Sequence, residues 1–401
     1  MKTVLIIGGN IYKDSDANGI CTRNIIRELS GRGYRVYCLS EPASKTDTYR
    51  APDTVTIIPV KEPWYSRFLE NNRSAVLFKT VSLFRYVATV FTYPDVSPRR
   101  TKRIIQACEA LLKTEKIDLI LGVYRPYESI AALLSLKRKY KEKIRCVAYH
   151  LDLLLSPNNT SRLIQRYKIA AGQRAYRKEL HMLDKILLPE GASGGGRDAK
   201  VSYVGFPLYT KAEGVPCETG FHKDRINITY IGSLDEVNRN PEFFLQAVDG
   251  MPDLKGRVCV HFWGKMTDAV LEIIRRYPQL ATYHGIVKNA HVPYIYEKSD
   301  FLLNISNRNT PDMIPSKIYQ MFASERPIIN CVSDPKDRAA GIIEKYPAAF
   351  TLYEYRDNDP AAFADFLTRP HDMSGVSEDA YATSTPGYVA DAILDGLCQG
   401  I

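Results

Sequence analysis

Short runs of apolar, β-branched residues alternate with helical patterns through the first half of the chain. Each run has the length of a buried strand, and the segment after it repeats apolar residues at three- and four-residue spacing. This alternation predicts a parallel sheet with helices on both faces. The predicted strands are 2–7, 35–39, 54–60, 117–123, 144–149, 185–189 and 200–204, and the predicted helices are 19–31, about 74–91, 101–114, 126–140 and 160–182.

The same alternation restarts near residue 226, after a segment rich in Gly and Pro (200–225) that indicates a linker. Further strands are predicted in INITYIGSL, VCVHFWG, ATYHGIV, FLLNIS and IINCVS, and further helices at 241–248, 268–276, 291–298, 315–324 and 337–345. A chain of 401 residues is also too long for one ordinary core.

We therefore predict an α/β protein of two doubly wound parallel-sheet domains, 1–205 and 206–377, facing a cleft. Ligands of such sheets bind outside the carboxyl ends of the strands.

The amino-acid composition limits the kinds of protein that this chain can be. The chain is 45% hydrophobic and 25% charged, as in globular proteins, and its eight cysteines lack metal-site spacing. MKTVLIIGGN resembles a first strand more than a signal peptide, and no stretch has about 18 apolar residues in a row. We expect a cytoplasmic protein without a metal or cofactor.

The net charge of +9 suggests an anionic partner. Residues 61–103 hold nine Lys and Arg against three acids. No nucleic-acid-binding motif is present, so a phosphorylated small molecule or an anionic membrane surface is expected. The segment 74–91 allows two readings, an amphipathic helix packed on its own sheet or a contact with a membrane.

The segment NTPDMIPSKIYQMFASERPII (309–329) joins two predicted strands through a loop and a helix. Pro315 suits the first helical position. The N–H groups of Ser316, Lys317 and Ile318 are then expected to lack internal partners and, with the Lys317 ammonium, to bind an anion. The alternative is a Pro-initiated surface helix with a solvated lysine.

Two glycine loops offer similar chemistry. Gly8 and Gly9 end the first strand and Gly19 opens the next helix, although the spacing is not that of a dinucleotide fingerprint. These glycines could equally serve tight turns. In YIGSLDEVNRNPEFFLQAV (230–248), Arg239 is the one cation of a polar loop and could face a diphosphate.

The run YIGS…NRNPEFFLQAV, followed by VHFWGK, YHGIV, SDFLLNISN and PSKIYQMFASERPII, resembles retaining glycosyltransferases of the GT-B fold, specifically family four. Members of that family build bacterial surface polysaccharides. The resemblance covers nearly all of 226–333, but in the first domain only the layout and HLDLL (150–154).

The resemblance implies a nucleotide-sugar donor, here expected to be a UDP-sugar, and a glycan or lipid-linked glycan acceptor. It also implies a terminal helix in 378–401 that returns to the first domain. Arg239 and Asp312 are implied as catalytic residues, and Val287 as a backbone contact to the base. The implied donor-binding residues are Gly9, Gly19, Gly232, Ser233, Asn238, Gly264, Lys265, Val287, Asn307, Met313, Pro315, Ser316, Lys317 and Gln320.

Asp312 and Gln320 stand where the family usually has two glutamates, so the donor contacts are expected to differ from the family pattern. Gln320 can hydrogen-bond a ribose hydroxyl without charge.

His150 and Asp152 follow a first-domain strand and are candidate catalytic residues, with a packed, hydrogen-bonded histidine as the alternative. Arg125 and Glu128 are candidate acceptor-binding residues. We predict a metal-independent hexosyltransferase, peripheral at the inner face of the cell membrane. The rival hypotheses are a non-catalytic GT-B subunit that binds a partner and a nucleotide-sugar 2-epimerase.

Overall fold

The structure is a computed structural model of the 401-residue chain. It describes residues 1–12, 17–44, 49–61, 92–124, 126–151, 162–190, 198–211, 213–309, 311, 314–373 and 378–395. The chain divides into two compact units, Met1–Leu208 with Thr383–Ile401, and Tyr209–Ala382. The predicted boundaries, 205/206 and 377/378, lie within a few residues of these.

The first unit contains a seven-stranded parallel sheet in the order β3-β2-β1-β4-β5-β6-β7. Its elements are β1 (Thr3–Ile7), α1 (Ala17–Gly31), β2 (Arg35–Ser40), β3 (Val55–Pro59), α4 (Pro98–Thr114), β4 (Leu119–Tyr124), α5 (Tyr127–Tyr140), β5 (Arg145–His150), α6 (Arg162–Met182), β6 (Lys185–Pro189), β7 (Val201–Val204) and α13 (Pro386–Leu394), with a short 3-10 turn at Lys141–Lys143. A further 3-10 segment, Glu378–Ser384, spans the boundary between the two units.

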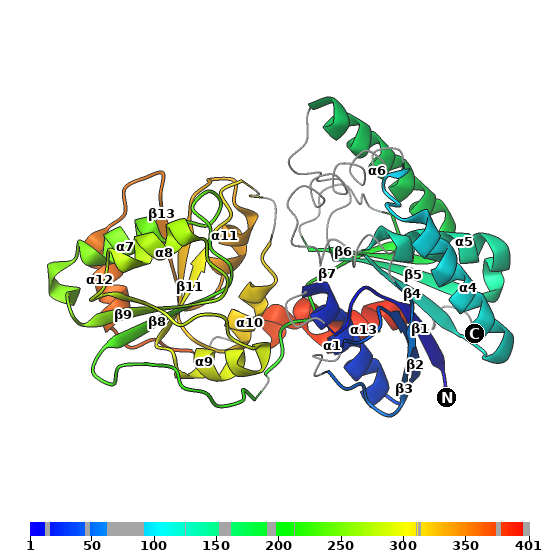
Figure 1. Ribbon diagram of the computed structural model, residues 1–401, viewed down its shortest axis with the longest axis horizontal. Coiled ribbons are helices and arrows are strands. Elements are labelled where there is room, and N and C mark those ends of the chain that lie inside the picture. The colour runs from blue at the N-terminus through cyan, green and yellow to red at the C-terminus, as the bar shows by residue number, and fades with distance from the viewer. Residues whose placement is uncertain are drawn as a thin grey trace. The chain divides into compact units, whose positions relative to one another are not determined.

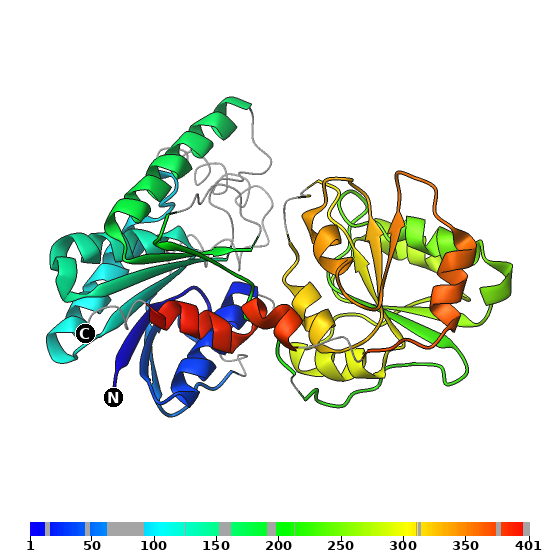
Figure 2. The ribbon, with the colours of Figure 1, turned by 180° about the vertical axis from the view of Figure 1, so that it is seen from behind.

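Helices cover both faces of this sheet, as the alternation predicts (Figures 1 and 2). Alternate residues of each strand, such as Leu5 and Ile7, pack under α4, α5 and α6 in one hydrophobic cluster. The other face is covered by α1 and α13, which pack against each other.

The C-terminal helix α13 belongs to the first unit, where it contacts α1, β6 and β7. Just before it, the Gly205 N–H donates to the Thr383 carbonyl oxygen at 2.9 Å. A Cβ atom at Gly205 would lie 1.9 Å from the Ser384 Oγ. Only glycine therefore allows the returning chain to approach this closely.

The second unit contains a six-stranded parallel sheet in the order β10-β9-β8-β11-β12-β13. Its elements are β8 (Ile226–Ile231), α7 (Glu242–Asp249), β9 (Val258–Trp263), α8 (Asp268–Arg275), β10 (Ala281–Tyr283), α9 (Val292–Lys298), β11 (Phe301–Ile305), α10 (Lys317–Ala323), β12 (Ile328–Val332), α11 (Arg338–Ile343), β13 (Ala349–Tyr353) and α12 (Pro360–Thr368), with 3-10 turns at Pro252–Leu254 and Asn289–His291.

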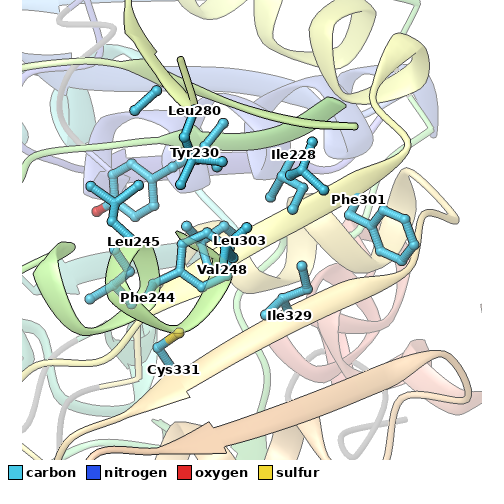
Figure 3. Packing of buried hydrophobic residues seen from close by; sticks show 14 of the residues in the cluster. Ile228, Tyr230, Phe244, Leu245, Val248, Leu280, Phe301, Leu303, Ile329 and Cys331 are labelled. Carbon is cyan, nitrogen blue, oxygen red and sulfur yellow. The ribbon is translucent and has the colours of Figure 1, made fainter. Parts of the chain in front are cut away.

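The core of this unit lies between the sheet and the helices α7, α8 and α12. Figure 3 shows Phe244, Leu245 and Val248 of α7 facing strand residues such as Leu303. Burial of these apolar side chains fixes the register of β8 and β11, the two strands whose ends carry the candidate site.

Among the described residues, the predicted elements are present with small shifts at their ends. Two were not predicted, β13 and α12: AFTLY is short, and the start signal of α12, the capping Asp359 followed by Pro360, was overlooked. The predicted helix 74–91 lies outside the described residues. No described helix is both long and apolar enough to cross a membrane.

Candidate functional site

The strand order of the second sheet reverses between β8 and β11, which are neighbours in the sheet although β9 and β10 lie between them in the chain. The loops that leave their carboxyl ends therefore diverge to opposite sides and leave room for a ligand. Gly232 to Asn240 follow β8, and Ser306 to Asn309 follow β11. The candidate site is built from these loops and from the start of α10.

Two glycines bring the loops after β8 and β9 into backbone contact. A Cβ atom at Gly264 would lie 2.0 Å from the Gly232 carbonyl oxygen, and Gly264 has φ +121°. Gly232 has φ +157° and donates its N–H to the Trp263 carbonyl oxygen at 2.9 Å. The Gly264 N–H in turn donates to the Gly285 carbonyl oxygen at 2.8 Å. Gly264 is thus required by close packing, whatever its role toward a ligand.

Arg239 is fixed at the end of the β8 loop. Its Nε donates to the Asn307 Oδ1 at 2.5 Å, and the same oxygen accepts from the Asn238 Nδ2 at 3.3 Å. Asn238 also accepts from the Arg308 N–H at 2.9 Å through its carbonyl oxygen. Asn307 is 2% exposed, and its Nδ2 has no hydrogen-bond partner within the described part of the chain. A buried amide donor and a guanidinium therefore lie side by side.

Lys317 folds back over the sheet instead of extending into solvent. Its ammonium nitrogen lies 4.0 Å from the centroid of the Tyr230 ring and 3.4 Å from the Ile231 carbonyl oxygen. Burial first, and the positive charge of Arg239 second, lower the pKa of Lys317 well below its usual value. Burial raises the pKa of the Tyr230 phenol to about 12, against the opposing effect of Arg239.

Arg239 and Lys317 therefore both act on Tyr230: the Lys317 ammonium lies over its ring, and the rise that burial causes in the pKa of its phenol is opposed by the positive charge of Arg239. Within the described ranges, no carboxylate forms an ion pair with either cation. The two cations repel each other, and an anion carrying more than one charge would relieve this repulsion.

The start of α10 differs from the prediction. The helix begins at Lys317, with Ser316 at the N-cap, so Pro315 precedes the cap instead of occupying the first helical position. The Ile318 N–H donates to the Pro315 carbonyl oxygen at 3.2 Å and is not available to an anion. The prediction of three free N–H groups is wrong for Ile318, because the tight turn at Pro315 uses that donor. The lysine side chain, more than the helix end, is therefore the candidate group for binding an anion.

Other predicted donor residues of this unit surround the same sheet edge. Ser233 and Lys265 are exposed, whereas Gln320 and Val287 are half-buried. The Ser233 carbonyl oxygen accepts from the Tyr230 phenol at 3.0 Å. Asp312 and Met313 lie outside the described residues, so their predicted roles stay predictions.

The glycine loop of the first unit is held by packing. Ser40 Oγ donates to the Gly9 carbonyl oxygen at 2.9 Å. A Cβ atom at Gly19 would lie 2.3 Å from the Asn10 carbonyl oxygen. The structure thus supplies the tight-turn explanation for Gly19, and donor binding by Gly9 and Gly19 stays a prediction.

His150 ends β5 and is buried against α6, where its Nε2 lies 2.6 Å from the Glu179 Oε2. The two side chains are 2% and 0% exposed. The packed, hydrogen-bonded alternative therefore describes His150, and direct substrate contact is not open to it in this conformation. Glu128 is likewise 2% exposed, at the start of α5, which does not suit an acceptor contact. Asp152 and Arg125 lie outside the described residues.

Two residues of these sites were missed in the sequence. Tyr230 is the last but one residue of β8, and its pattern is that of any aromatic residue in a buried strand. The Gly-Ser pair that follows Ile231 marks the end of the strand and could have drawn attention to it. Glu179 is the single acid of a 21-residue basic helix and lies on its buried side, which could have indicated an internal partner.

The described residues contain no group of three or more His, Cys, Asp and Glu side chains that could hold a metal ion. No protein-family model matches the chain, and no curated protein matches it.

Solved structures do match. The α,α-trehalose 6-phosphate synthase from Burkholderia multivorans has a TM-score of 0.60 at 13% identity, covering 99% of this chain and 98% of that one. A UDP-N-acetylglucosamine 2-epimerase has a TM-score of 0.56 at 13% identity, covering 99% and 94%. WaaG, a glycosyltransferase involved in lipopolysaccharide biosynthesis, has a TM-score of 0.53 at 11% identity, covering 98% and 99%. At these identities the likeness shows the fold, which is that of GT-B glycosyltransferases.

Proposed function

We propose that the protein is a glycosyltransferase that moves a sugar from a nucleotide-diphosphate donor, preferably a UDP-sugar, to a glycan or lipid-linked glycan. Transfer would proceed with retention and without a metal ion, and the product would belong to a surface polysaccharide. The observation that carries this proposal is the proximity of both Arg239 and Lys317 to Tyr230, at the point where the strand order of the second sheet reverses.

The two cations suit the leaving group of such a reaction. When the bond between the sugar and the diphosphate breaks, negative charge develops on the distal phosphate. Arg239 and Lys317 would stabilise that charge, and Asn307 would add a neutral donor. The acceptor hydroxyl, whose oxygen forms the new bond, gives up its proton to the departing diphosphate or to solvent.

The chain's similarity to a UDP-N-acetylglucosamine 2-epimerase supports a second candidate, an epimerase acting on the same class of substrate. That reaction also cleaves the bond to the diphosphate, so the anion site would serve it equally. A non-catalytic subunit remains a third hypothesis, because Asp312 and Gln320 replace the glutamates of the family that the sequence resembles.

A thermal-shift screen followed by product analysis distinguishes the three. A nucleotide sugar at a hundred times its dissociation constant should add about 2.7 kcal/mol to the free energy of unfolding. Transfer to a glycan acceptor supports the transferase, and interconversion of UDP-N-acetylglucosamine with its 2-epimer supports the epimerase. Binding of UDP without turnover of any donor supports the subunit.

We also propose that an acceptor at the membrane would be reached through the basic segment 61–103. Of this segment the structure describes Lys61 and residues 92–103, in which Arg99, Lys102 and Arg103 are exposed. Binding to anionic vesicles that falls with rising salt would support this contact, and equal binding to neutral vesicles would contradict it.

A further inference from the structure

The positive charge of the protein is concentrated on one layer of helices. The sequences of α4, α5 and α6 contain five, three and six Lys and Arg residues, against one Glu in each helix. The excess of eleven positive charges exceeds the +9 of the entire chain. These helices cover the same face of the first sheet, so the charge is collected on one side of this unit (Figure 1).

Part of this charge is neutralised by acids of other elements: Arg100 and Lys137 are buried and pair with Glu41 and Asp184, each at 2.9 Å. The acids of the layer itself neutralise little of the rest. Glu128 and Glu179 are buried, and Glu109 pairs with Lys139 at 2.6 Å. Arg99, Lys102 and Arg103 lie in the first turns of α4, a helix end at which positive charge is disfavoured. An external anion would offset this repulsion.

The outer side of α6 carries a straight row of exposed basic side chains, which we call the track. Arg166, Arg174, Arg177 and Lys178 are exposed there and form no ion pair with any described residue. Their helical spacing places them within one arc of the surface, and a helix rise of 1.5 Å per residue makes the track about 18 Å long. Tyr167 is the only large apolar side chain of the three helices that is described as exposed.

We propose that α6 binds an extended anionic polysaccharide, bearing carboxylate or phosphate groups, along this track. Guanidinium groups match such anions through paired hydrogen bonds. A linear track fits a linear polymer better than a flat bilayer, and insertion into a bilayer would need apolar side chains that the described outer side lacks apart from Tyr167. The choice of a glycan over another polyanion rests on the proposed function, because a glycan-extending enzyme must hold its acceptor chain.

The test measures binding of polygalacturonate, a carboxylated glycan, to the full chain in the absence of nucleotide. The variant replaces Arg166, Arg174, Arg177 and Lys178 by Gln. The matched control removes the same charge from exposed lysines of the second unit, Lys255, Lys288, Lys336 and Lys345. Cooperative melting and unchanged UDP affinity show that each variant folds and keeps its donor site.

The α6 variant should lose at least about tenfold in affinity for polygalacturonate at low salt, and the control should lose much less. The reason is that each cation that contacts the polyanion releases counterions, and this release adds to the free energy of binding. Binding should weaken with added salt, and neutral dextran should not bind. Equal losses in both variants would show that net charge alone is responsible and would overturn the track. A preference for duplex DNA or for phosphatidylglycerol vesicles, lost in the α6 variant, would overturn the choice of a glycan. Failure of sugar transfer with the track intact would instead count against the proposed function.

Discussion

The ammonium nitrogen of Lys317 lies 4.0 Å from the centre of the Tyr230 ring, and the rise that burial causes in the pKa of the phenol of the same tyrosine is opposed by the positive charge of Arg239. A helix residue and a loop residue are thereby held over one strand residue, although 78 positions separate them along the chain. The relationship places two like charges together without a described acidic partner, and for this reason we propose a polyvalent anion as the ligand.

This relationship predicts that UDP binding takes up a proton. The pKa of Lys317 is lowered in the free protein, mainly by burial, and a bound diphosphate would raise it again. Between the two pKa values, UDP affinity should therefore fall as pH rises. Calorimetry in two buffers of different ionisation heat counts the protons, and Lys317→Met should abolish the uptake. Proton release on binding would contradict the prediction.

The same shift predicts the pH dependence of stability without ligand. The unfolded lysine keeps its usual pKa of 10.5, so between the folded and unfolded values the unfolded chain binds more protons. The free energy of unfolding should thus rise with pH in that window. Lys317→Met should flatten the rise in urea titrations, and an unchanged slope would place the ammonium in water.

Asn307→Asp should weaken UDP binding by changing charge at constant shape. The new carboxylate would pair with Arg239, whose Nε already donates to this position, and would repel the diphosphate. A loss of about 10- to 100-fold in UDP affinity is expected, from the value of one charge-assisted contact. Asn307→Ala serves as the control and should lose less. Equal losses in the two variants would mean that UDP affinity depends on the Asn307 amide and not on the charge next to Arg239.

Gly264→Ala should destabilise the second unit. Its Cβ would meet the Gly232 carbonyl oxygen at 2.0 Å, and φ +121° is unfavourable for alanine. The expected loss is on the order of 2–4 kcal/mol, measured by urea unfolding. Gly341→Ala is the matched control, because a Cβ at that helical glycine meets nothing within 4 Å. It should be neutral or stabilising by about 0.5–1 kcal/mol.

The layout of both sheets was predictable because buried parallel strands appear as continuous apolar runs, such as TVLII and FLLNI. The placement of Arg239 and Lys317 after neighbouring strand ends was also predictable, since both stand in polar segments that follow such runs. The conformation of Lys317 was not. Whether a lysine folds inward depends on the space above Tyr230, which is set by the packing of α10 and not by local sequence.

His150 illustrates the same limit in the first unit. Its position at the end of β5 fits a catalytic residue and a packed one equally well, and only the distant Glu179 decides between them. A contact across 29 residues leaves no periodic signal in the sequence. For Lys317, by contrast, a measurement separates the two alternatives: a lysine that binds a diphosphate contributes to UDP affinity, and a solvated surface lysine does not.

The most direct test of the diphosphate site is calorimetric titration of UDP and of uridine into wild type, Lys317→Ala and the exposed-lysine control Lys255→Ala. Lys317→Ala should lose about 10- to 100-fold in UDP affinity, since one charge-assisted contact is removed, while any uridine binding stays unchanged. Lys255→Ala should match wild type. Unchanged UDP affinity in a folded Lys317→Ala protein would contradict the assignment of the diphosphate to Arg239 and Lys317, and with it the proposed sugar transfer.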